Sequence, residues 1–449
     1  MKKIISFIVF LCLLIIPCEA KTIDKVISKS NLGLRSALAL YIINSDTNKV
    51  IYKKNEQKLL NPASTLKLIT FSTSYKVLGP DYLFKTALYK SGSDLYLKLG
   101  GDTLLTSKDL EDLFKDAKTK VDFNKINNIY IDDSIMNKYL PYPSGWMQDD
   151  IWPHSRMITP YIIDNNKVKI AIQRSSLATK VDIVQNDEYK LPIINDLTLS
   201  LDESKIQDIK IEKMYGEDSS IIKFSGTVNK DEMFDLPVLK PEINFNIKLR
   251  NALEKNKIVF MKKINAKSMP QNAQEIAFVS HSIDEIGKKI LLNSDTFGAE
   301  TVFRIAAAKH INYKHPATMQ DAIDMFYEIN APYKEEDIKV TDGSGVSRYN
   351  LISAKVAVEI FNKLNKETDV SKLMATPGSG TLKNRMLFLE GNLRAKTGTL
   401  SNMSALLGTL KTKKGRQIIF CTIIQNSPKR KAILKNFEND LITTIYRRY

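Results

Sequence analysis

The chain has 449 residues, of which 43% are apolar and 26% are charged, and it carries a formal net charge of +16. This length is too great for one ordinary hydrophobic core and suits two or three domains. The composition is that of a folded globular protein, which excludes a disordered or collagen-like chain.

The first 20 residues have the pattern of a secretory signal. Lys2 and Lys3 precede a mostly apolar run over residues 4–16, and Cys18 and Ala20 are the small residues of a cleavage site. The apolar run is shorter than the ~20 residues that a membrane-spanning helix needs. We therefore predict a signal peptide over residues 1–20, cleaved after Ala20, and a periplasmic protein. An uncleaved anchor and a lipid-modified Cys18 are the alternatives.

Neither the cysteines nor the histidines form a metal-binding pattern. After cleavage Cys421 is the one cysteine left, in an apolar run typical of a buried thiol, so no internal disulfide is expected. The four histidines are scattered, and we expect no metal or organic cofactor. The basic charge favours anionic lipid and acidic cell-wall polymer as partners. Nucleic acid is not expected, because no nucleic-acid-binding motif is present and export argues against it.

The first expected elements are a hairpin, a helix and a long insertion. Residues 38–44 and 50–52 predict two strands joined by a turn. Asn61-Pro62 is a typical helix start, so we expect a helix from Pro62 to about Val77. Residues 86–237 are rich in short β-prone runs and turn signals, which predicts an inserted β-rich domain with room for a nested subdomain.

The C-terminal part returns to helices and strands. Helices are expected over about 283–311, with a break at 293–296, and over 353–364 with Ser353 as a cap. Strands at 404–411 and 417–425 follow, and then a basic amphipathic helix over 429–447. We expect that helix to pack on the sheet; a peripheral contact with a membrane is the alternative.

This order of elements predicts an α+β fold. The strands near the two ends of the chain can share one antiparallel sheet. Residues 21–85 and 238–449 would then form one discontinuous domain, interrupted by the insertion.

Ser64-Thr65-Leu66-Lys67 has the spacing of a nucleophile and its base. Residues three apart face the same side of a helix, and backbone N–H groups are unpaired in the first turn. Ser64 is therefore a candidate nucleophile, and Lys67 is the candidate base. A lysine pKa is ordinarily near ~10.4, so this role needs burial and a second cation to lower it. A second match, Ser220 and Lys223, lies in a β-prone stretch and is attributed to chance.

The segment Arg394-Ala395-Lys396-Thr397-Gly398-Thr399 precedes the two expected C-terminal strands. On an edge strand, a glycine lets a ligand approach the backbone closely. Lys396 would supply the second cation, and the Thr397 hydroxyl would bind a substrate carboxylate. The N–H groups of Thr399 and Ser64 would form an oxyanion hole. An ordinary basic turn before a hairpin is the alternative.

Ser294-Asp295-Thr296 lies in the break of the helical pattern. The Ser294 hydroxyl is a candidate proton relay between the lysines and a leaving amine. The alternative is a Ser/Asp cap that begins a new helix. The three segments in this order are much more specific than any one of them.

Together the three segments match the signature of penicillin-binding proteins and related β-lactamases. The chain resembles the D-alanyl-D-alanine carboxypeptidase/endopeptidase family, the low-molecular-mass class C penicillin-binding proteins. Further segments that match this family are 100–106, 145–150, 342–350 and 380–385. The resemblance covers nearly all of the mature chain and is weakest over about 181–235.

The resemblance implies a transpeptidase-like domain and a serine-type D-Ala-D-Ala carboxypeptidase that acts on peptidoglycan stem peptides through an acyl-enzyme. It also implies D-alanyl endopeptidase activity and inhibition by β-lactams. The alternatives are a non-catalytic peptidoglycan-binding protein with this fold, and a β-lactamase, against which the large insertion argues. One position departs from the family: Thr296 replaces the usual Asn, and its shorter side chain is expected to reach Lys67 more readily than the substrate.

Two other segments are assigned no catalytic role. Trp146 and Trp152 flank Asp149-Asp150; these residues either line a cleft that contacts a diamino acid side chain or, as we favour, form an aromatic cluster beside solvated carboxylates. Residues 342–348 are expected to border the cleft, with glycines that serve tight turns.

Overall fold

The structure is a computed structural model that describes residues 20–138, 143–146, 156–175, 180–202, 204, 206–214 and 221–449. Residues 1–19 of the expected signal peptide lie outside the described residues, as do Asp149, Asp150 and Trp152. Among the residues that are described, no helix is long and apolar enough to span a membrane.

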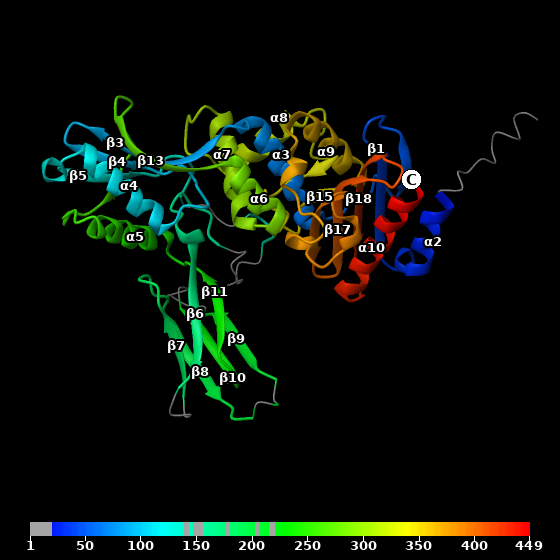
Figure 1. Cartoon of the computed structure of the whole chain (residues 1–449), viewed down its shortest axis with the longest axis horizontal. Coiled ribbons are helices and arrows are strands. Elements are labelled where there is room, and N and C mark those ends of the chain that lie inside the picture. Colours follow the sequence, from blue (N-terminus) through cyan, green and yellow to red (C-terminus); the bar gives the residue numbers. More distant parts are fainter. Residues whose placement is uncertain are drawn as a thin grey trace, which may run out of the picture.

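One five-stranded antiparallel sheet is built from both ends of the chain, in the order β16-β17-β18-β1-β2 (Figure 1). This confirms the expected hairpin and the shared sheet. Cys421 lies buried in β18, where burial raises the pKa of its thiol, in keeping with a structural role. The strands are β1 (Ala37–Asn44), β2 (Val50–Lys54), β16 (Leu393–Leu400), β17 (Met403–Lys411) and β18 (Gln417–Gln425).

Helices cover both faces of this sheet. Alternate side chains of β1 point to opposite faces, so Leu38 and Leu40 pack in one apolar cluster and Ala39 and Tyr41 in another. The first cluster includes α2 (Ala20–Ser30) and α10 (Lys431–Arg448), which confirms that the terminal helix packs on the sheet. The second includes α3 (Leu66–Leu78), α6 (Ile283–Asn293), α7 (Thr296–His310), α8 (Met319–Ile329) and α9 (Ala354–Thr368).

The ends of these helices follow the sequence signals. A 3-10 turn, η2 (Ala63–Thr65), precedes α3, and Gly79 with φ 85° ends it. The Ser353 hydroxyl caps α9 by accepting a hydrogen bond from the N–H of Val356 at 3.2 Å. The expected helices and the cap are therefore confirmed.

A second five-stranded sheet has the order β12-β5-β4-β3-β13. Its strands are β3 (Leu83–Ser91), β4 (Asp94–Lys98), β5 (Asn128–Asp132), β12 (Asn265–Ala266) and β13 (Gln274–Ser282). Helices α4 (Ser107–Lys120) and α5 (Pro241–Lys255) share its apolar cluster, and α4 was not predicted. Because β12 and β13 complete this sheet, we propose that the insertion runs to Ser282 rather than to residue 237.

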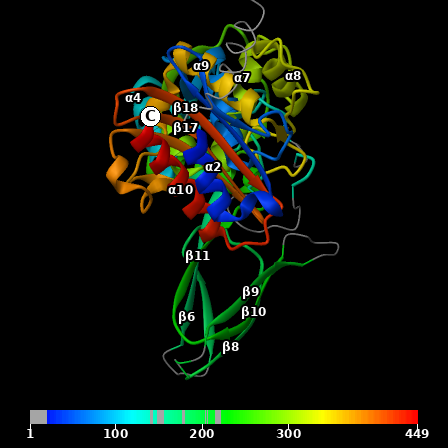
Figure 2. The ribbon, with the colours of Figure 1, turned by 90° about the vertical axis from the view of Figure 1, so that its right-hand side faces the viewer.

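A smaller β unit projects from the elongated body (Figures 1 and 2). Two three-stranded sheets, β11-β6-β7 and β8-β10-β9, enclose an apolar cluster of their own. This unit has the position of the nested subdomain expected within the insertion. Its strands are β6 (Lys167–Arg174), β7 (Val181–Gln185), β8 (Ile193–Leu199), β9 (Asp208–Lys213), β10 (Ile222–Val228) and β11 (Glu232–Pro237).

The remaining elements are short. They are η1 (Leu32–Leu34), η3 (Phe123–Lys125), η5 (Asp164–Asn166), β14 (Ile338–Lys339), β15 (Leu351–Ile352), η6 (Val370–Leu373), η7 (Gly380–Leu382) and η8 (Leu387–Leu389).

Candidate active site

Ser64 lies in the 3-10 turn that begins α3, and it is partly exposed while the residues around it are buried. The preceding residue, Ala63, has φ 46°, a left-handed conformation that an alanine rarely adopts. The Asn61 side-chain oxygen Oδ1 accepts a hydrogen bond from the N–H of Ala63 at 2.8 Å, and Asn61 Nδ2 donates to the backbone carbonyl of Ser347 at 3.0 Å. A strained turn held in this way is typical of a functional site.

Lys67 lies one turn further along, with a fully buried side chain. Its Nζ donates to Ser64 Oγ at 3.1 Å and to the backbone carbonyl of Ser344 at 2.7 Å. Burial lowers the pKa of Lys67 to about 8, against the carboxylates of Asp342, Glu300 and Asp295, which raise it. Roughly a tenth of this amine is therefore neutral at pH 7, far more than for a lysine with the ordinary pKa, and the neutral form is the one that acts as a base.

Lys396 on β16 is also fully buried. Its Nζ donates to Ser294 Oγ at 2.8 Å and to the carbonyl of Thr397 at 3.0 Å. Burial, and then repulsion by the Lys67 ammonium, hold the pKa of Lys396 well below its usual value. Each buried amine therefore contacts a serine hydroxyl, and burial rather than a second cation is the cause of the lowered pKa of Lys67.

Ser294 and Asp295 connect α6 to α7. Ser294 has φ 62°, and the Asp295 carboxylate caps α7 by accepting the N–H of Gly298 at 3.2 Å. The Arg156 guanidinium donates to Asp295 Oδ1 at 2.7 Å, with both side chains nearly buried. The segment is thus a helix cap, and its Ser294 hydroxyl also accepts a hydrogen bond from Lys396.

Thr296 is the first residue of α7 and is buried at 6% exposure. In the described part of the chain, the acceptors of the Lys67 ammonium are Ser64 and Ser344, and Thr296 is not among them. The Thr296 hydroxyl therefore accepts no hydrogen bond from Lys67 in the described chain.

β16 is the edge strand of the terminal sheet, and its residue Gly398 lies close to the turn that holds Ser64. The N–H of Ala395 points away from β17, because it donates to the carbonyl of Ala375 at 3.0 Å. N–H directions alternate along a strand, so those of Thr397 and Thr399 point to the same outer side. A Cβ added to Gly398 would lie 3.2 Å from the backbone nitrogen of Ser64. The strand therefore needs a glycine here to approach the serine.

Asp342 organises the loop that was expected to border the cleft and was assigned no catalytic role. Its buried carboxylate accepts the N–H groups of Gly345 and Ser347, each at 2.7 Å. It also accepts Nδ2 of Asn350 at 2.8 Å and Nε1 of Trp146 at 2.7 Å. The loop places the Ser344 carbonyl on Lys67. In the sequence, the loop was marked only by segment 342–350, which resembles the family but contains no residue to which a catalytic role was assigned.

A buried acid–base pair lies behind Lys67. Glu300 and Arg304, one turn apart on α7, form an ion pair at 2.9 Å with side chains at 0% and 1% exposure. Burial first, and then the charge of Asp342, raise the pKa of Glu300 to about 7. Lys67 therefore lies near the Glu300 carboxyl group as well as near Lys396.

Of the remaining sequence candidates, the lysine of the second serine–lysine match lies on the β unit, whereas Trp146 contacts the Asp342 loop. Lys223 sits on β10 and pairs with Asp196 at 2.6 Å, while Ser220 lies outside the described residues. Trp146 is buried against Asp342 at 7% exposure.

The arrangement suits acyl transfer by a serine. The partly exposed Ser64 hydroxyl contacts the buried Lys67 amine, and the Ser294 hydroxyl contacts the buried Lys396 amine. The edge strand β16 adds N–H groups that point outward from the sheet.

Comparison with known proteins agrees with this chemistry. The family model described as the D-Ala-D-Ala carboxypeptidase 3 (S13) family matches residues 19–445. The chain is 23% identical over 439 residues to D-alanyl-D-alanine carboxypeptidase DacB of Haemophilus influenzae, covering 90% of each chain. It is 22% identical over 407 residues to a D-alanyl-D-alanine carboxypeptidase of Actinomadura sp., covering 83% of this chain and 75% of the relative.

Solved structures share the fold. The crystal structure of penicillin binding protein 4 (dacB) from Haemophilus influenzae has a TM-score of 0.81 at 22% identity, covering 95% of this chain and 99% of that chain. The same protein complexed with a novel β-lactam has a TM-score of 0.75. The chain therefore belongs to the D-Ala-D-Ala carboxypeptidase 3 (S13) family and is a hydrolase with the penicillin-binding-protein fold.

Proposed function

We propose that Ser64 is the nucleophile with which this carboxypeptidase cleaves the terminal D-alanyl-D-alanine bond of peptidoglycan stem peptides. The observation that carries this proposal is the 3.1 Å hydrogen bond between Lys67 Nζ and the partly exposed Ser64 Oγ. The lowered pKa of Lys67 supports its role as the base.

The acylation step conserves atoms and protons. Ser64 Oγ attacks the carbonyl carbon of the penultimate D-alanine, and neutral Lys67 takes the hydroxyl proton. The C–N bond then breaks. Ser294, hydrogen-bonded to Lys396, gives its hydroxyl proton to the leaving nitrogen and recovers a proton through the two lysines, so that the proton taken up by Lys67 is the one returned. Free D-alanine leaves and an ester on Ser64 remains, which water hydrolyses with release of the shortened peptide.

The edge strand β16 supplies binding groups in this proposal. The outward N–H of Thr399 and the N–H of Ser64 would stabilise the oxyanion, and the Thr397 hydroxyl would bind the terminal carboxylate. Thr296 would contact the substrate amide where its reach allows. Residues 397 and 399 are both partly exposed, which permits these contacts.

The setting of the enzyme belongs to the same proposal. A signal peptide over residues 1–20 would direct the chain to the periplasm, where the stem peptides are. β-Lactams would acylate Ser64 as substrate mimics, and D-alanyl cross-links would be cleaved as well as free ends. The apolar stripe of α10 is buried on the sheet, so any peripheral membrane contact would use another surface.

Release of D-alanine from a peptide ending in D-Ala-D-Ala tests the proposal. Wild-type protein should release D-alanine, and Ser64→Ala should not. Ser72→Ala is the matched control, because Ser72 lies on the same helix and its hydroxyl only bonds the carbonyl of Leu68 at 2.6 Å. Full activity of Ser64→Ala would refute the assignment of the nucleophile.

A further inference from the structure

Arg156 lies almost fully buried between the insertion and the Ser294 segment of the active site. Its side chain is 4% exposed, and that of Asp295, its ion-pair partner, is 8% exposed. Nη2 donates to Asp295 Oδ1 at 2.7 Å, and the guanidinium carbon lies 4.5 Å from the centre of the Phe297 ring. The guanidinium is therefore held at the start of α7 by a charged partner and by an aromatic ring.

Both oxygens of the Asp295 carboxylate are engaged. Oδ1 accepts from Arg156, and Oδ2 accepts the N–H of Gly298 in the first turn of α7 at 3.2 Å. The preceding residue, Ser294, has φ 62°, a left-handed conformation that a serine rarely adopts and that persists only where the surroundings impose it. Arg156 and the start of α7 thus support the backbone that carries the Ser294 hydroxyl, which accepts from Lys396 Nζ at 2.8 Å.

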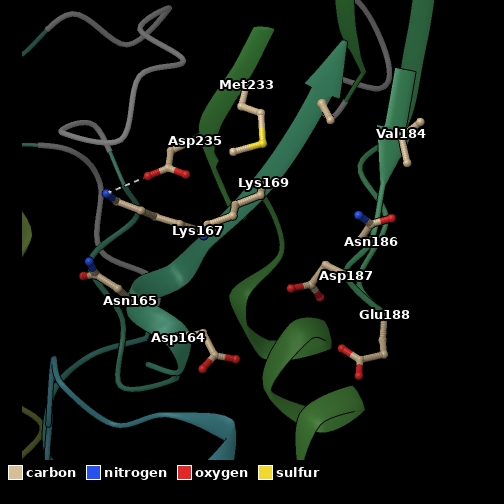
Figure 3. Close-up of a pocket in the computed structure, with 11 residues that line it drawn as sticks. Asp164, Asn165, Lys167, Lys169, Val184, Asn186, Asp187, Glu188, Met233 and Asp235 are labelled. Carbon is tan, nitrogen blue, oxygen red and sulfur yellow. Dashed lines mark hydrogen bonds and ion pairs between the residues drawn. The ribbon is translucent and has the colours of Figure 1, made fainter. Parts of the chain in front are cut away.

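The other half of the guanidinium binds the turn before β6. Nη1 donates to the backbone carbonyl of Asn165 at 2.7 Å and also bonds the side-chain oxygen of the same residue. Asn165 belongs to a left-handed turn, residues 164–166, with φ of 48°, 59° and 48°. Figure 3 shows Asp164 and Asn165 on this turn, where the chain enters β6. One side chain thus joins the base of the β unit to the active-site cluster.

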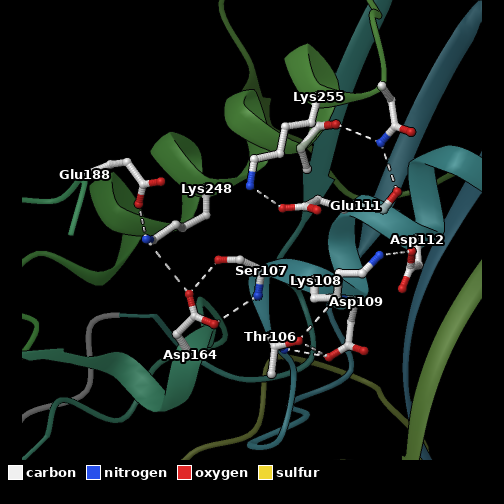
Figure 4. A network of polar contacts seen from close by, with 12 residues as sticks. Thr106, Ser107, Lys108, Asp109, Glu111, Asp112, Asp164, Glu188, Lys248 and Lys255 are labelled. Carbon is white, nitrogen blue, oxygen red and sulfur yellow. Dashed lines mark hydrogen bonds and ion pairs between the residues drawn. The ribbon is translucent and has the colours of Figure 1, made fainter. Parts of the chain in front are cut away.

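The turn itself is anchored to the body of the insertion (Figure 4). Asp164 accepts the N–H and the hydroxyl of Ser107, at the start of α4, at 2.9 and 2.5 Å. The nearly buried Lys248 of α5 lies 4.0 Å from Asp164, and it binds Asp187 at 2.8 Å and Glu188. The oxygens that this turn offers to the guanidinium therefore belong to one continuous polar network that includes α4, α5 and the loop after β7.

We propose that Arg156 is a positioning residue that holds the Ser294 hydroxyl in place through Asp295, which rests on the proposed function. That hydroxyl gives its proton to the leaving nitrogen only if it lies within hydrogen-bond reach when the C–N bond breaks. Without the guanidinium, the Asp295 carboxylate loses its Oδ1 partner and the left-handed segment loses one of its two supports. The insertion, which supplies both Arg156 and Asn165, thereby takes part in expelling D-alanine without touching the substrate.

The test compares two substrates that differ in the leaving atom. One is a peptide ending in D-Ala-D-Ala, whose leaving amine needs a proton; the other has a thioester in place of the scissile amide, and its thiolate leaves without a proton. In Arg156→Gln, kcat/KM for the amide should fall about tenfold, whereas kcat/KM for the thioester should fall less than about twofold. Arg156→Lys should recover part of the lost amide activity, because an ammonium still pairs with Asp295 but does not also span to Asn165.

A second variant leaves the buried ion pair intact. Asn165→Gly removes only the side-chain acceptor of Arg156, at a half-buried position where glycine tolerates the left-handed conformation. The amide-to-thioester ratio of kcat/KM should fall in the same direction by a smaller factor. Arg250→Gln is the matched control, because Arg250 on α5 also bridges two segments, through the carbonyls of Phe260 and Lys262 at 3.3 and 3.0 Å, and should leave the ratio unchanged.

Two results would overturn the positioning role. One is an equal loss of kcat/KM for both substrates in Arg156→Gln, which would indicate general damage to the site; the other is an unchanged ratio in the folded variants at positions 156 and 165. Either result contradicts the role of Arg156 alone, provided that wild-type protein hydrolyses both substrates and Ser64→Ala hydrolyses neither. Wild-type protein that hydrolyses neither substrate contradicts the proposed function as well.

Discussion

Lys67 makes a shorter hydrogen bond to the backbone carbonyl of Ser344, at 2.7 Å, than to the Ser64 hydroxyl, at 3.1 Å. In this chain the buried amine is therefore held by a backbone oxygen. The Asp342 carboxylate fixes that oxygen through the N–H groups of Gly345 and Ser347. Thr296 is not among the hydrogen-bond acceptors of Lys67 in the described chain, so this loop, rather than Thr296, positions the amine.

The rate of acylation should rise with pH. Lys67 has a pKa of about 8, lowered by burial, and only its neutral form accepts a proton from Ser64. We expect the second-order rate constant for acylation by penicillin to fall about tenfold per pH unit well below pH 8 and to level off above it. Because Lys67 and Lys396 titrate as a coupled pair, the measured midpoint belongs to the pair. A rate that is independent of pH between 6 and 9 would contradict a lysine base.

Replacing Asp342 should move this pH dependence. Its negative charge raises the pKa of Lys67, so Asp342→Asn should shift the midpoint to lower pH. The plateau rate should also fall, because the Ser344 carbonyl loses its support. Glu336→Gln, an exposed acid before β14, is the control and should change neither value. If Asp342→Asn lowers the acylation rate but does not shift the pH midpoint, the charge of Asp342 does not act on Lys67 and the residue only supports the loop.

Restoring the family's residue should increase activity. Thr296→Asn places an amide that both donates and accepts at the start of α7, and one well-placed hydrogen bond is worth about 1–3 kcal/mol. We expect kcat/KM for D-alanine release to rise about fivefold or more. Thr296→Val should lower kcat/KM only modestly, because it removes a contact with the substrate amide but no hydrogen bond to Lys67. A large loss of activity in Thr296→Val would show that the threonine is itself a needed contact.

A buried ion pair under α10 should govern stability. Arg385 donates to Glu438 at 2.8 Å, and Glu438 also accepts the hydroxyl of Ser404 on β17 at 2.6 Å. Arg385→Met would leave Glu438 charged and unpaired at 0% exposure, which costs about 3–5 kcal/mol. Chemical denaturation should show this loss, whereas Lys383→Met at an exposed position should change the free energy of unfolding by less than about 0.5 kcal/mol. Equal stabilities of the two variants would be the contrary result.

Local signals in the sequence predicted the terminal sheet, α3, α9 and α10, because alternation, caps and amphipathic spacing are properties of short segments. Helix α4 was missed although Thr106 and Asp109 form a capping box, which is visible in the sequence. The pairing of β13 with β3, on which the proposed longer insertion rests, was not visible in the sequence, because it joins segments that are distant in the chain.

In the candidate site, too, local motifs were visible in the sequence and contacts between distant segments were not. The motifs pointed to Ser64, Lys67, Ser294 and Lys396, because serine and lysine at these spacings have a known chemistry. The support from the Ser344 carbonyl was not found, because a backbone oxygen leaves no mark in the sequence. The bond from Arg156 to Asp295 was likewise invisible, because only the fold brings the insertion to α7.

Mass spectrometry of the protein after reaction with penicillin, with the adduct mapped to a peptide, is the most direct test of the account. We predict a long-lived adduct on the peptide that contains Ser64, and none in Ser64→Ala. An adduct on another residue, or penicillin that is turned over without a stable adduct, would contradict the assignment of Ser64 as the acylated nucleophile of a penicillin-binding carboxypeptidase.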